Sequence, residues 1–159
     1  MTVKKTTWNK KPKKEKVKKE TKVETKALLK KRIKKLDTVV SRYIRLKYSD
    51  KNWMTECISC GKSLHWTEAH CAHFIWRARM STRFLEDNLR SACPWCNVYR
   101  AEFHMRMYTI KLIQENGLDF VEKLIILWNK VKQWKPNELE EMYNKYYLLV
   151  KKLEWNLHV

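Results

Sequence analysis

Two pairs of cysteines constrain this chain more than any other feature of its sequence. Cys57 and Cys60 form one C-x-x-C pair, Cys93 and Cys96 form a second, and 32 residues separate the pairs. Each pair can direct two thiolates at one point, and four thiolates at about 2.3 Å complete the tetrahedral shell that structural Zn²⁺ prefers. Gly61 follows the first pair, where a tight knuckle needs a permissive backbone. The spacing therefore predicts a structural zinc site with a functional insert between its two halves.

A fifth cysteine, Cys71, gives the chain an odd number of thiols. An odd number favours metal binding or chemistry over disulfides and fits a reducing compartment. The lysine-rich start lacks the apolar segment of a secretory signal. No apolar run approaches the roughly 20 residues of a membrane span. We therefore expect a cytoplasmic protein that is neither secreted nor embedded in a membrane.

Basic residues are concentrated at the start of the chain. The 159 residues carry a formal net charge of +18, and residues 1–35 contain 16 basic and three acidic side chains. Such a block repels itself until a polyanion neutralises it, which favours nucleic acid as the partner over an anionic membrane surface. Residues 1–26 contain too little apolar material to pack. They are predicted to form a basic arm that is disordered when free.

Residues 27–50 are predicted to form an amphipathic helix. Apolar residues recur there at steps of three and four from Leu29 to Ile44, the pattern of a helix with one buried face. The other face is basic and is expected to lie on DNA phosphates. Its predicted DNA contacts are Lys30, Lys31, Lys34, Arg42 and Arg45.

More helices are predicted after the second cysteine pair. Helical periodicity returns through about Glu115, resumes from Asp119 to Trp134, and continues beyond Pro136 to about Trp155. Asn137 and Glu140 have the spacing of a capping pair for the last of these helices. Residues 117–159 are expected to supply helix packing and a dimer interface, since their aromatic residues alternate with aliphatic ones at helical spacing.

The helical period disappears over residues 51–91, where short β-like segments at 53–55 and 73–76 accompany the histidines. This segment has the layout of a ββα-metal (HNH) nuclease finger. A strand ends in a histidine, a loop returns past an asparagine, and a helix begins at a Cys-Asn pair. In that chemistry a metal-free histidine takes a proton from water while a divalent cation binds the scissile phosphate. His73 is the candidate base, Asn97 a candidate metal ligand, and Asn88 is expected to fix the loop that orients the base.

The expected fold class is therefore α+β, mostly α. A zinc-stapled, treble-clef-like HNH finger with its trailing helix occupies residues 51–116, and long helices flank it.

One combined pattern covers most of the chain after about Leu28. It consists of residues 35–37 and 41–45, both cysteine pairs, residues 72–74 and 82–84, Asn88, Asn97 and Gly117. In this pattern the sequence resembles the NinG/Rap family of lambdoid phage recombination nucleases, which cut branched DNA. The arrangement around zinc is also similar to that of phage junction-resolving endonucleases with four zinc cysteines and a His plus Asn active site.

The resemblance implies Mg²⁺- or Mn²⁺-dependent cutting of Holliday junctions, D-loops or other branched intermediates, in the host cytoplasm and alongside recombination proteins. Symmetric paired cuts across a junction call for two active sites and hence a homodimer.

Two positions differ from the patterns of these nucleases. Many family members carry an aspartate three residues before the catalytic histidine, where this chain has His70. Other HNH enzymes place an aspartate directly before it, where this chain has Ala72. Imidazole suits Mn²⁺ better than Mg²⁺, which prefers hard oxygen ligands. His70 is therefore either a ligand of the catalytic cation together with Asn97, or a histidine that contacts phosphate.

Other assignments remain open in the insert. Glu68, Glu86 or Asp87 could supply the missing carboxylate. His73 could instead bind zinc together with Cys71 and one cysteine pair, although Cys71 is better explained as a buried thiol.

Arg77, Arg79 and Arg83 lie in the loop that would face DNA, and guanidinium groups suit phosphate contacts. The alternatives are a solvated loop and, for Arg83, a brace of the fold. Two other functions compete with a junction nuclease. One is a catalytically inactive zinc-finger protein that binds nucleic acid, and the other is a general HNH nuclease without branch specificity.

Overall fold

The computed structural model describes residues 22–158, so most of the predicted basic arm lies outside the described residues. The described part is mostly helical, with two small antiparallel sheets, as expected for the α+β class. In chain order its helices and strands are α1 (Lys22–Lys47), β1 (Met54–Glu56), β2 (Ser63–His65), β3 (His70–His73), β4 (Leu89–Ala92), α2 (Ala101–Asn116), α3 (Leu118–Trp128) and α4 (Pro136–His158). A short 3₁₀ turn at Glu86–Asn88 precedes β4, and a π-helical turn at Trp95–Tyr99 precedes α2.

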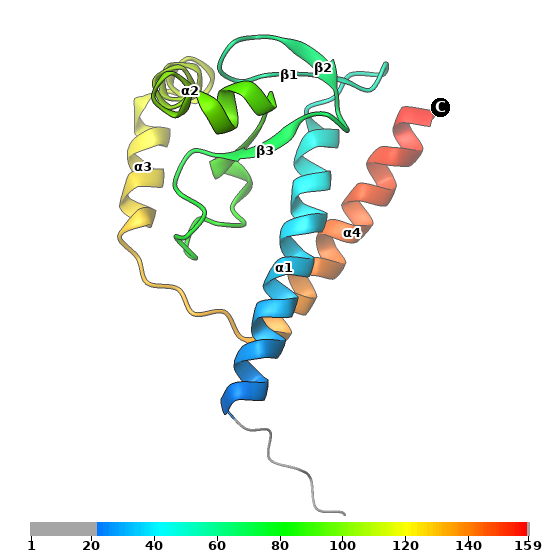
Figure 1. The fold of residues 1–159 in the computed structure, drawn as a ribbon, viewed down its shortest axis with the longest axis vertical. Helices are drawn as coiled ribbons and strands as arrows, with labels where there is room; N and C mark the ends of the chain where they lie inside the picture. Colours follow the sequence, from blue (N-terminus) through cyan, green and yellow to red (C-terminus); the bar gives the residue numbers. More distant parts are fainter. Residues whose placement is uncertain (1–21, 159) are drawn as a thin grey trace, which may run out of the picture.

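The first and last helices, α1 and α4, lie side by side (Figure 1). The predicted amphipathic helix is present as α1, which begins earlier than expected, at Lys22. Its apolar stripe is buried against α4 and the loop after β3. The core that they share includes Leu36, Val40, Ile44, Phe84, Leu89, Leu139, Tyr146 and Val150.

The connection into α4 differs from the sequence prediction in two respects. Helix α3 ends at Trp128, because the chain then extends so that the Trp134 indole N–H can donate to the Met80 carbonyl at 3.0 Å. The predicted capping pair of Asn137 and Glu140 is wrong, since the Glu138 carboxylate accepts the backbone N–H of Lys135 at 2.7 Å. A proline in the first turn followed by this acidic cap is a common way to begin a helix.

The hairpin of β3 and β4 lies between two hydrophobic cores. Its register pairs His70 with Ala92 and His73 with Leu89, and side chains alternate between the two faces of a strand. Leu89 belongs to the core under α1 and α4, whereas Ala92 belongs to the core under α2 and α3. The two faces of β3 therefore face different hydrophobic cores.

Strand β3 ends at His73 rather than continuing to residue 76 as the sequence predicted. The Ile75 N–H turns away from the sheet to donate to the side-chain oxygen of Asn88 at 2.6 Å. The Phe74 N–H still donates to the Asn88 carbonyl at 2.9 Å, so the Asn88 side chain replaces backbone pairing from Ile75 onward.

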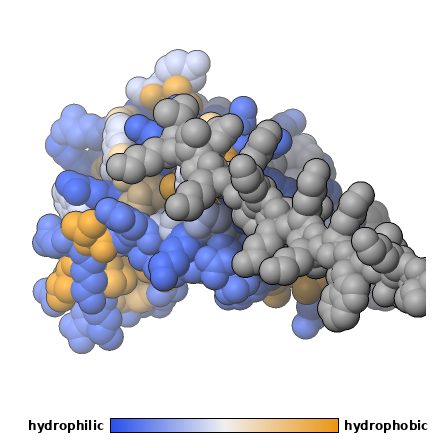
Figure 2. All heavy atoms as spheres, turned by 90° about the horizontal axis from the view of Figure 1, so that it is seen from below, coloured by the Kyte–Doolittle hydropathy of each residue, from blue (hydrophilic) through white to orange (hydrophobic). Residues whose placement is uncertain are grey.

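Large hydrophobic side chains are exposed on α2 and α3. Figure 2 shows hydrophobic surface on the side of the molecule that carries α3 in Figure 1. The exposed residues on these helices include Ile110, Ile113, Leu118, Ile125, Ile126 and Trp128. None of the described helices is both long enough and apolar enough to cross a membrane.

Candidate functional site

The two cysteine pairs meet at one point, as the spacing predicted. The sulfur atoms of Cys57, Cys60, Cys93 and Cys96 all lie within 4.8 Å of one another. The Cys60 and Cys93 sulfurs are 3.9 Å apart, close to the ~3.8 Å edge of a tetrahedron with ~2.3 Å metal–sulfur bonds. All four thiols are free of disulfides. Within residues 22–158 this is the one group of three or more His, Cys, Asp or Glu side chains with the spacing of a metal site.

The backbone after Cys57 and Cys60 forms a tight turn at Gly61. Gly61 has a φ of +70°, a left-handed conformation that glycine adopts without strain, and its N–H donates to the Cys57 carbonyl at 2.9 Å. Burial raises the pKa of the Cys57 thiol, but hydrogen bonds from the backbone of Cys93 and Cys60 outweigh it, and the net shift is downward. A donor set of four cysteines in two knuckles fits structural zinc.

A buried histidine on α2 supports this cluster and was missed by the sequence analysis. The His104 ring contacts the hydroxyl of Ser59, which lies between Cys57 and Cys60, and His104 is 4% exposed. Burial lowers the pKa of His104. The contact packs the first knuckle against α2, and no spacing rule in the sequence connects the two residues.

The structure brings together two of the predicted ligands of the catalytic cation. Asn97 follows the last cysteine, in the π-helical turn, and its side-chain amide lies 3.2 Å from Nδ1 of His70 at the start of β3. Both side chains are partly exposed. A carboxylate is missing from this pair, since the position of Ala72 on the same face holds a buried methyl group.

His73, the predicted base, emerges from the other face of β3. It lines a small hollow of about 90 Å³ between α1 and the loop after β3, with Asp37, Cys71, Arg77 and Arg83 among its neighbours. Burial, followed by the positive charge of Arg77, lowers the pKa of His73 to about 4, against the opposing effect of a hydrogen bond to the Arg83 backbone. The imidazole is therefore neutral at neutral pH.

An ion-pair cluster forms the wall of this hollow. Arg83 reaches both oxygens of Asp37, with Nε at 2.9 Å and Nη2 at 2.6 Å, and it donates to the Arg77 carbonyl at 2.9 Å. The Arg77 guanidinium also contacts Asp37, at 2.8 Å. Burial raises the pKa of Asp37, but the hydrogen bonds and charges of the two arginines outweigh it and hold that pKa below its usual value.

Asp37 was not among the residues chosen from the sequence, although a signal for it exists. It lies four residues after Ile33 and three before Val40, on the buried stripe of α1. A carboxylate on an apolar stripe needs a partner of opposite charge, because an unpaired buried charge is costly.

Asn88 is fully buried and holds the loop after β3. Besides accepting from Ile75, its side-chain amide donates to the carbonyls of Ile75 and Thr82 at 3.1 and 3.0 Å. Its side chain lies away from solvent, so its contribution to a reaction would be to fix the loop.

The predicted DNA-binding residues divide into exposed cations and structural ones. Arg45 is half-buried and donates to the carbonyls of Trp66, Thr67 and Ala69. Arg42 pairs with Glu154. The exposed cations, available to a phosphate backbone, are Lys30, Lys31, Lys34, Arg77 and Arg79.

The structure also shows where the other candidate residues of the insert lie. Burial raises the pKa of the Cys71 thiol to about 12, so it is a poor metal ligand or nucleophile. Glu86 binds Lys47 and the Tyr43 hydroxyl, at 2.9 and 3.0 Å. Glu68 and Asp87 are exposed.

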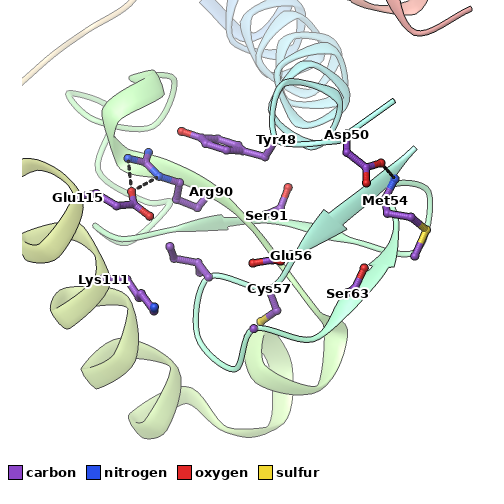
Figure 3. Close-up of a pocket in the computed structure, with 12 residues that line it drawn as sticks. Tyr48, Asp50, Met54, Glu56, Cys57, Ser63, Arg90, Ser91, Lys111 and Glu115 are labelled. Carbon is purple, nitrogen blue, oxygen red and sulfur yellow. Dashed lines mark hydrogen bonds and ion pairs between the residues drawn. The ribbon is translucent and has the colours of Figure 1, made fainter. Parts of the chain in front are cut away.

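A larger hollow of about 410 Å³ lies between the segment that follows α1, the β1–β2 hairpin, β4 and α2. Figure 3 shows the Arg90 side chain reaching across it to Glu115. These groups are 3.3 Å apart, and the Arg90 guanidinium lies 5.1 Å from the centre of the Tyr48 ring. Buried Arg90 therefore joins β4 to α2 and to Tyr48, the residue that follows α1. Of the predicted site residues, Cys57 is the one that lines this hollow.

Of three comparisons with known proteins, one identified a family. Searches of curated proteins and of solved structures each found no match. A family model described as Bacteriophage Lambda NinG protein matches residues 1–156, a span that runs through the cysteine cluster and into α4. The chain therefore belongs to the bacteriophage lambda NinG family.

Proposed function

We propose that the protein is a metal-dependent HNH endonuclease that hydrolyses phosphodiester bonds in branched DNA recombination intermediates. The observation that carries the proposal is the position of His73, at the end of β3 in a hollow that it shares with Arg77 and Arg83. Its pKa is lowered to about 4, so at neutral pH the ring has an acceptor nitrogen for the proton of an attacking water, as a weaker base than a free histidine. Asn88 fixes the loop around it.

The β3–β4 hairpin followed by the Cys-Asn turn and α2 has the chain order of a ββα-metal finger. In the proposed reaction His73 takes a proton from the attacking water. Asn97, through its amide oxygen, and His70, through its imidazole, are the groups that would hold Mg²⁺ or Mn²⁺, which when bound stabilises charge on the phosphate and leaving oxygens. Two protein donors suffice where water and substrate phosphate complete the shell, as is usual for Mg²⁺.

His70 begins β3 and His73 ends it, on opposite faces of the strand, so the proposal requires the cation and the base to approach the same phosphate from two sides of β3. The zinc of the four-cysteine cluster is assigned a structural role, separate from the catalytic cation.

The substrate and partners belong to the same proposal. Exposed lysines on α1 and arginines after β3 would bind phosphates without reading sequence. A homodimer would supply two active sites for paired cuts, and recombination proteins of the host or phage are candidate partners.

Cleavage of a labelled four-way junction, beside a linear duplex of equal length, tests the proposal. Zinc-loaded wild type and His73→Ala are assayed with Mg²⁺ and with Mn²⁺. His65→Ala is the matched control, because His65 is another partly exposed histidine, on β2, and hydrogen-bonds to Thr67. We expect junction-selective cutting that His73→Ala abolishes and His65→Ala retains. Equal cutting of both substrates would support a general HNH nuclease instead.

One observation favours a second candidate, a zinc-finger protein that binds branched DNA without cutting it. The position before His73 holds Ala72, which is 1% exposed, so the pair of His70 and Asn97 has no carboxylate from β3. Tight junction binding with no cutting in either cation would support this candidate and overturn the nuclease proposal.

A further inference from the structure

We propose that the hollow beside His73 is a receptor for one DNA phosphate, in which Arg77 makes the contact and Asp37 positions Arg77. This inference rests on the proposed function for its substrate, and it assigns to α1 a part in a site that the sequence placed wholly in the finger.

The first step of the argument is the charge inside the hollow. Two guanidinium groups, of Arg77 and Arg83, share the single carboxylate of Asp37, and the neighbouring His73 is neutral. The cluster therefore keeps one uncompensated positive charge. A site with a net positive charge favours an anion over a second cation, which argues against a metal ion at this point.

The second step is the difference between the two arginines. The Arg83 side chain is 15% exposed, and three of its nitrogens already donate to Asp37 or the Arg77 carbonyl. The Arg77 side chain is 56% exposed and makes one ion pair, to Asp37. A guanidinium has five N–H donors, so most of those on Arg77 remain for a ligand. Arg83 therefore braces the loop, and Arg77 is the residue that contacts the phosphate.

The third step is size. The hollow measures about 90 Å³, well below the ~300 Å³ of pockets that enclose a whole small molecule. It suits a single phosphate group whose sugar and base stay outside. A backbone phosphate of DNA meets this description, and guanidinium geometry matches its oxygens.

Asp37 then acts as a positioning residue. Its two oxygens hold both arginines from the rigid frame of α1, 46 residues away in sequence from Arg83. Removing its charge would leave Arg77 without an anchor while raising the local positive charge. Asp37 should therefore affect how a bound phosphate is placed more than how tightly DNA binds.

The contact is tested by junction binding in EDTA, where no cleavage is needed. Arg77→Gln is compared with Arg106→Gln, since Arg106 is an exposed arginine on α2 that also has one carboxylate partner, Glu102. We expect Arg77→Gln to weaken binding about tenfold and to reduce the salt dependence by about one phosphate contact. Arg106→Gln is expected to change affinity less than twofold. Equal losses in the two variants would overturn the phosphate receptor.

The positioning role is tested by Asp37→Asn, with Glu115→Gln as the control. Glu115 also pairs with a buried arginine, Arg90, at 3.3 Å, so both variants remove a carboxylate partner of an arginine. We expect Asp37→Asn to lower the cleavage rate of bound junction at least tenfold with affinity unchanged or tighter, and Glu115→Gln to leave that rate unchanged. Similar rates in both variants would make Asp37 a structural residue.

A readout without catalysis separates this inference from the nuclease proposal. Inorganic phosphate is titrated against protein with ¹⁵N-labelled arginine, and the Arg77 Nε–H signal is followed. The Arg77 signal should shift in the wild type, whereas the signal of Arg106, the exposed control arginine on α2, should not. If the wild type shows this shift but does not cut DNA, the nuclease proposal is wrong and the phosphate receptor stands. If the Arg77 signal does not shift, the phosphate receptor is wrong.

Discussion

Asp37 and Arg83 form a two-pronged ion pair that joins α1 to the loop after β3, with contacts of 2.9 and 2.6 Å. Their side chains are 12% and 15% exposed, so the pair is largely shielded from solvent. Through this ion pair, α1 fixes the loop that carries Arg77 and Arg83, the neighbours of His73. The stability of the hollow and its chemistry consequently depend on the same residues.

The first prediction concerns this ion pair. Arg83→Met should lower the free energy of unfolding by about 2 kcal/mol, between the values for exposed and fully buried pairs. The Asp37 pKa is below its usual value in the folded state, so its contribution is present above the unfolded pKa and is lost as pH falls through the folded pKa. Urea unfolding of wild type and Arg83→Met at pH 7 and at pH 3 measures this. The difference between the two proteins should shrink at the lower pH.

The second prediction concerns the titration of His73. Its folded pKa of about 4 lies below the ~6.5 of an unfolded histidine. The unfolded chain therefore binds the proton first, and this group destabilises the fold as pH falls from about 6.5 toward 4. His73→Gln should reduce the loss of stability over that range. NMR titration of the His73 ring gives the pKa directly, and a value near 6.5 would contradict the prediction.

The third prediction concerns the cysteine cluster. Purified protein should contain one equivalent of zinc, and Cys96→Ser should lose it, because four thiolates are needed to close the shell. Chelation should then unfold the segment between the cysteine pairs and loosen α2, since metal binding supplies folding free energy to such domains. Metal analysis and far-UV circular dichroism measure both effects. Cys71→Ser is the control, since Cys71 lies outside the cluster, and it should keep its zinc.

The sequence predicted those features that depend on local spacing. Two C-x-x-C pairs can close on one metal almost independently of what lies between them, and the apolar stripe from Leu29 to Ile44 determines which face of α1 is buried. The ends of elements were harder to predict, because they are decided by contacts between distant residues. Trp134 leaves the helical path to reach Met80, and the Asn88 side chain ends β3 by binding Ile75.

The candidate site was only partly accessible from the sequence for the same reason. His70 and Asn97 were expected to be close, and they are. The hollow around His73 depends on Asp37, whose distance in sequence from the finger hid its role. Arg45 and Arg83 look like DNA ligands in a sequence rich in basic residues, yet their hydrogen bonds to carbonyls and to Asp37 can be seen only in three dimensions.

The fourth prediction concerns the homodimer that paired cutting would need. Most of the apolar residues on α4 pack into the core shared with α1 in the same chain, and the large ones that α4 leaves exposed are Tyr147, Leu148 and Trp155. Helix α3 exposes Ile125 and Ile126, at 45% and 60%, and exposed apolar groups of this kind mark interaction surfaces. Ile126→Asp should convert a dimer into a monomer in light scattering coupled to size exclusion. Leu148→Asp on α4, where Leu148 is 67% exposed, is the matched control and should remain a dimer. A wild type that is monomeric at micromolar concentration, both free and on a junction, would contradict the prediction and require the two cuts to be made in separate binding events.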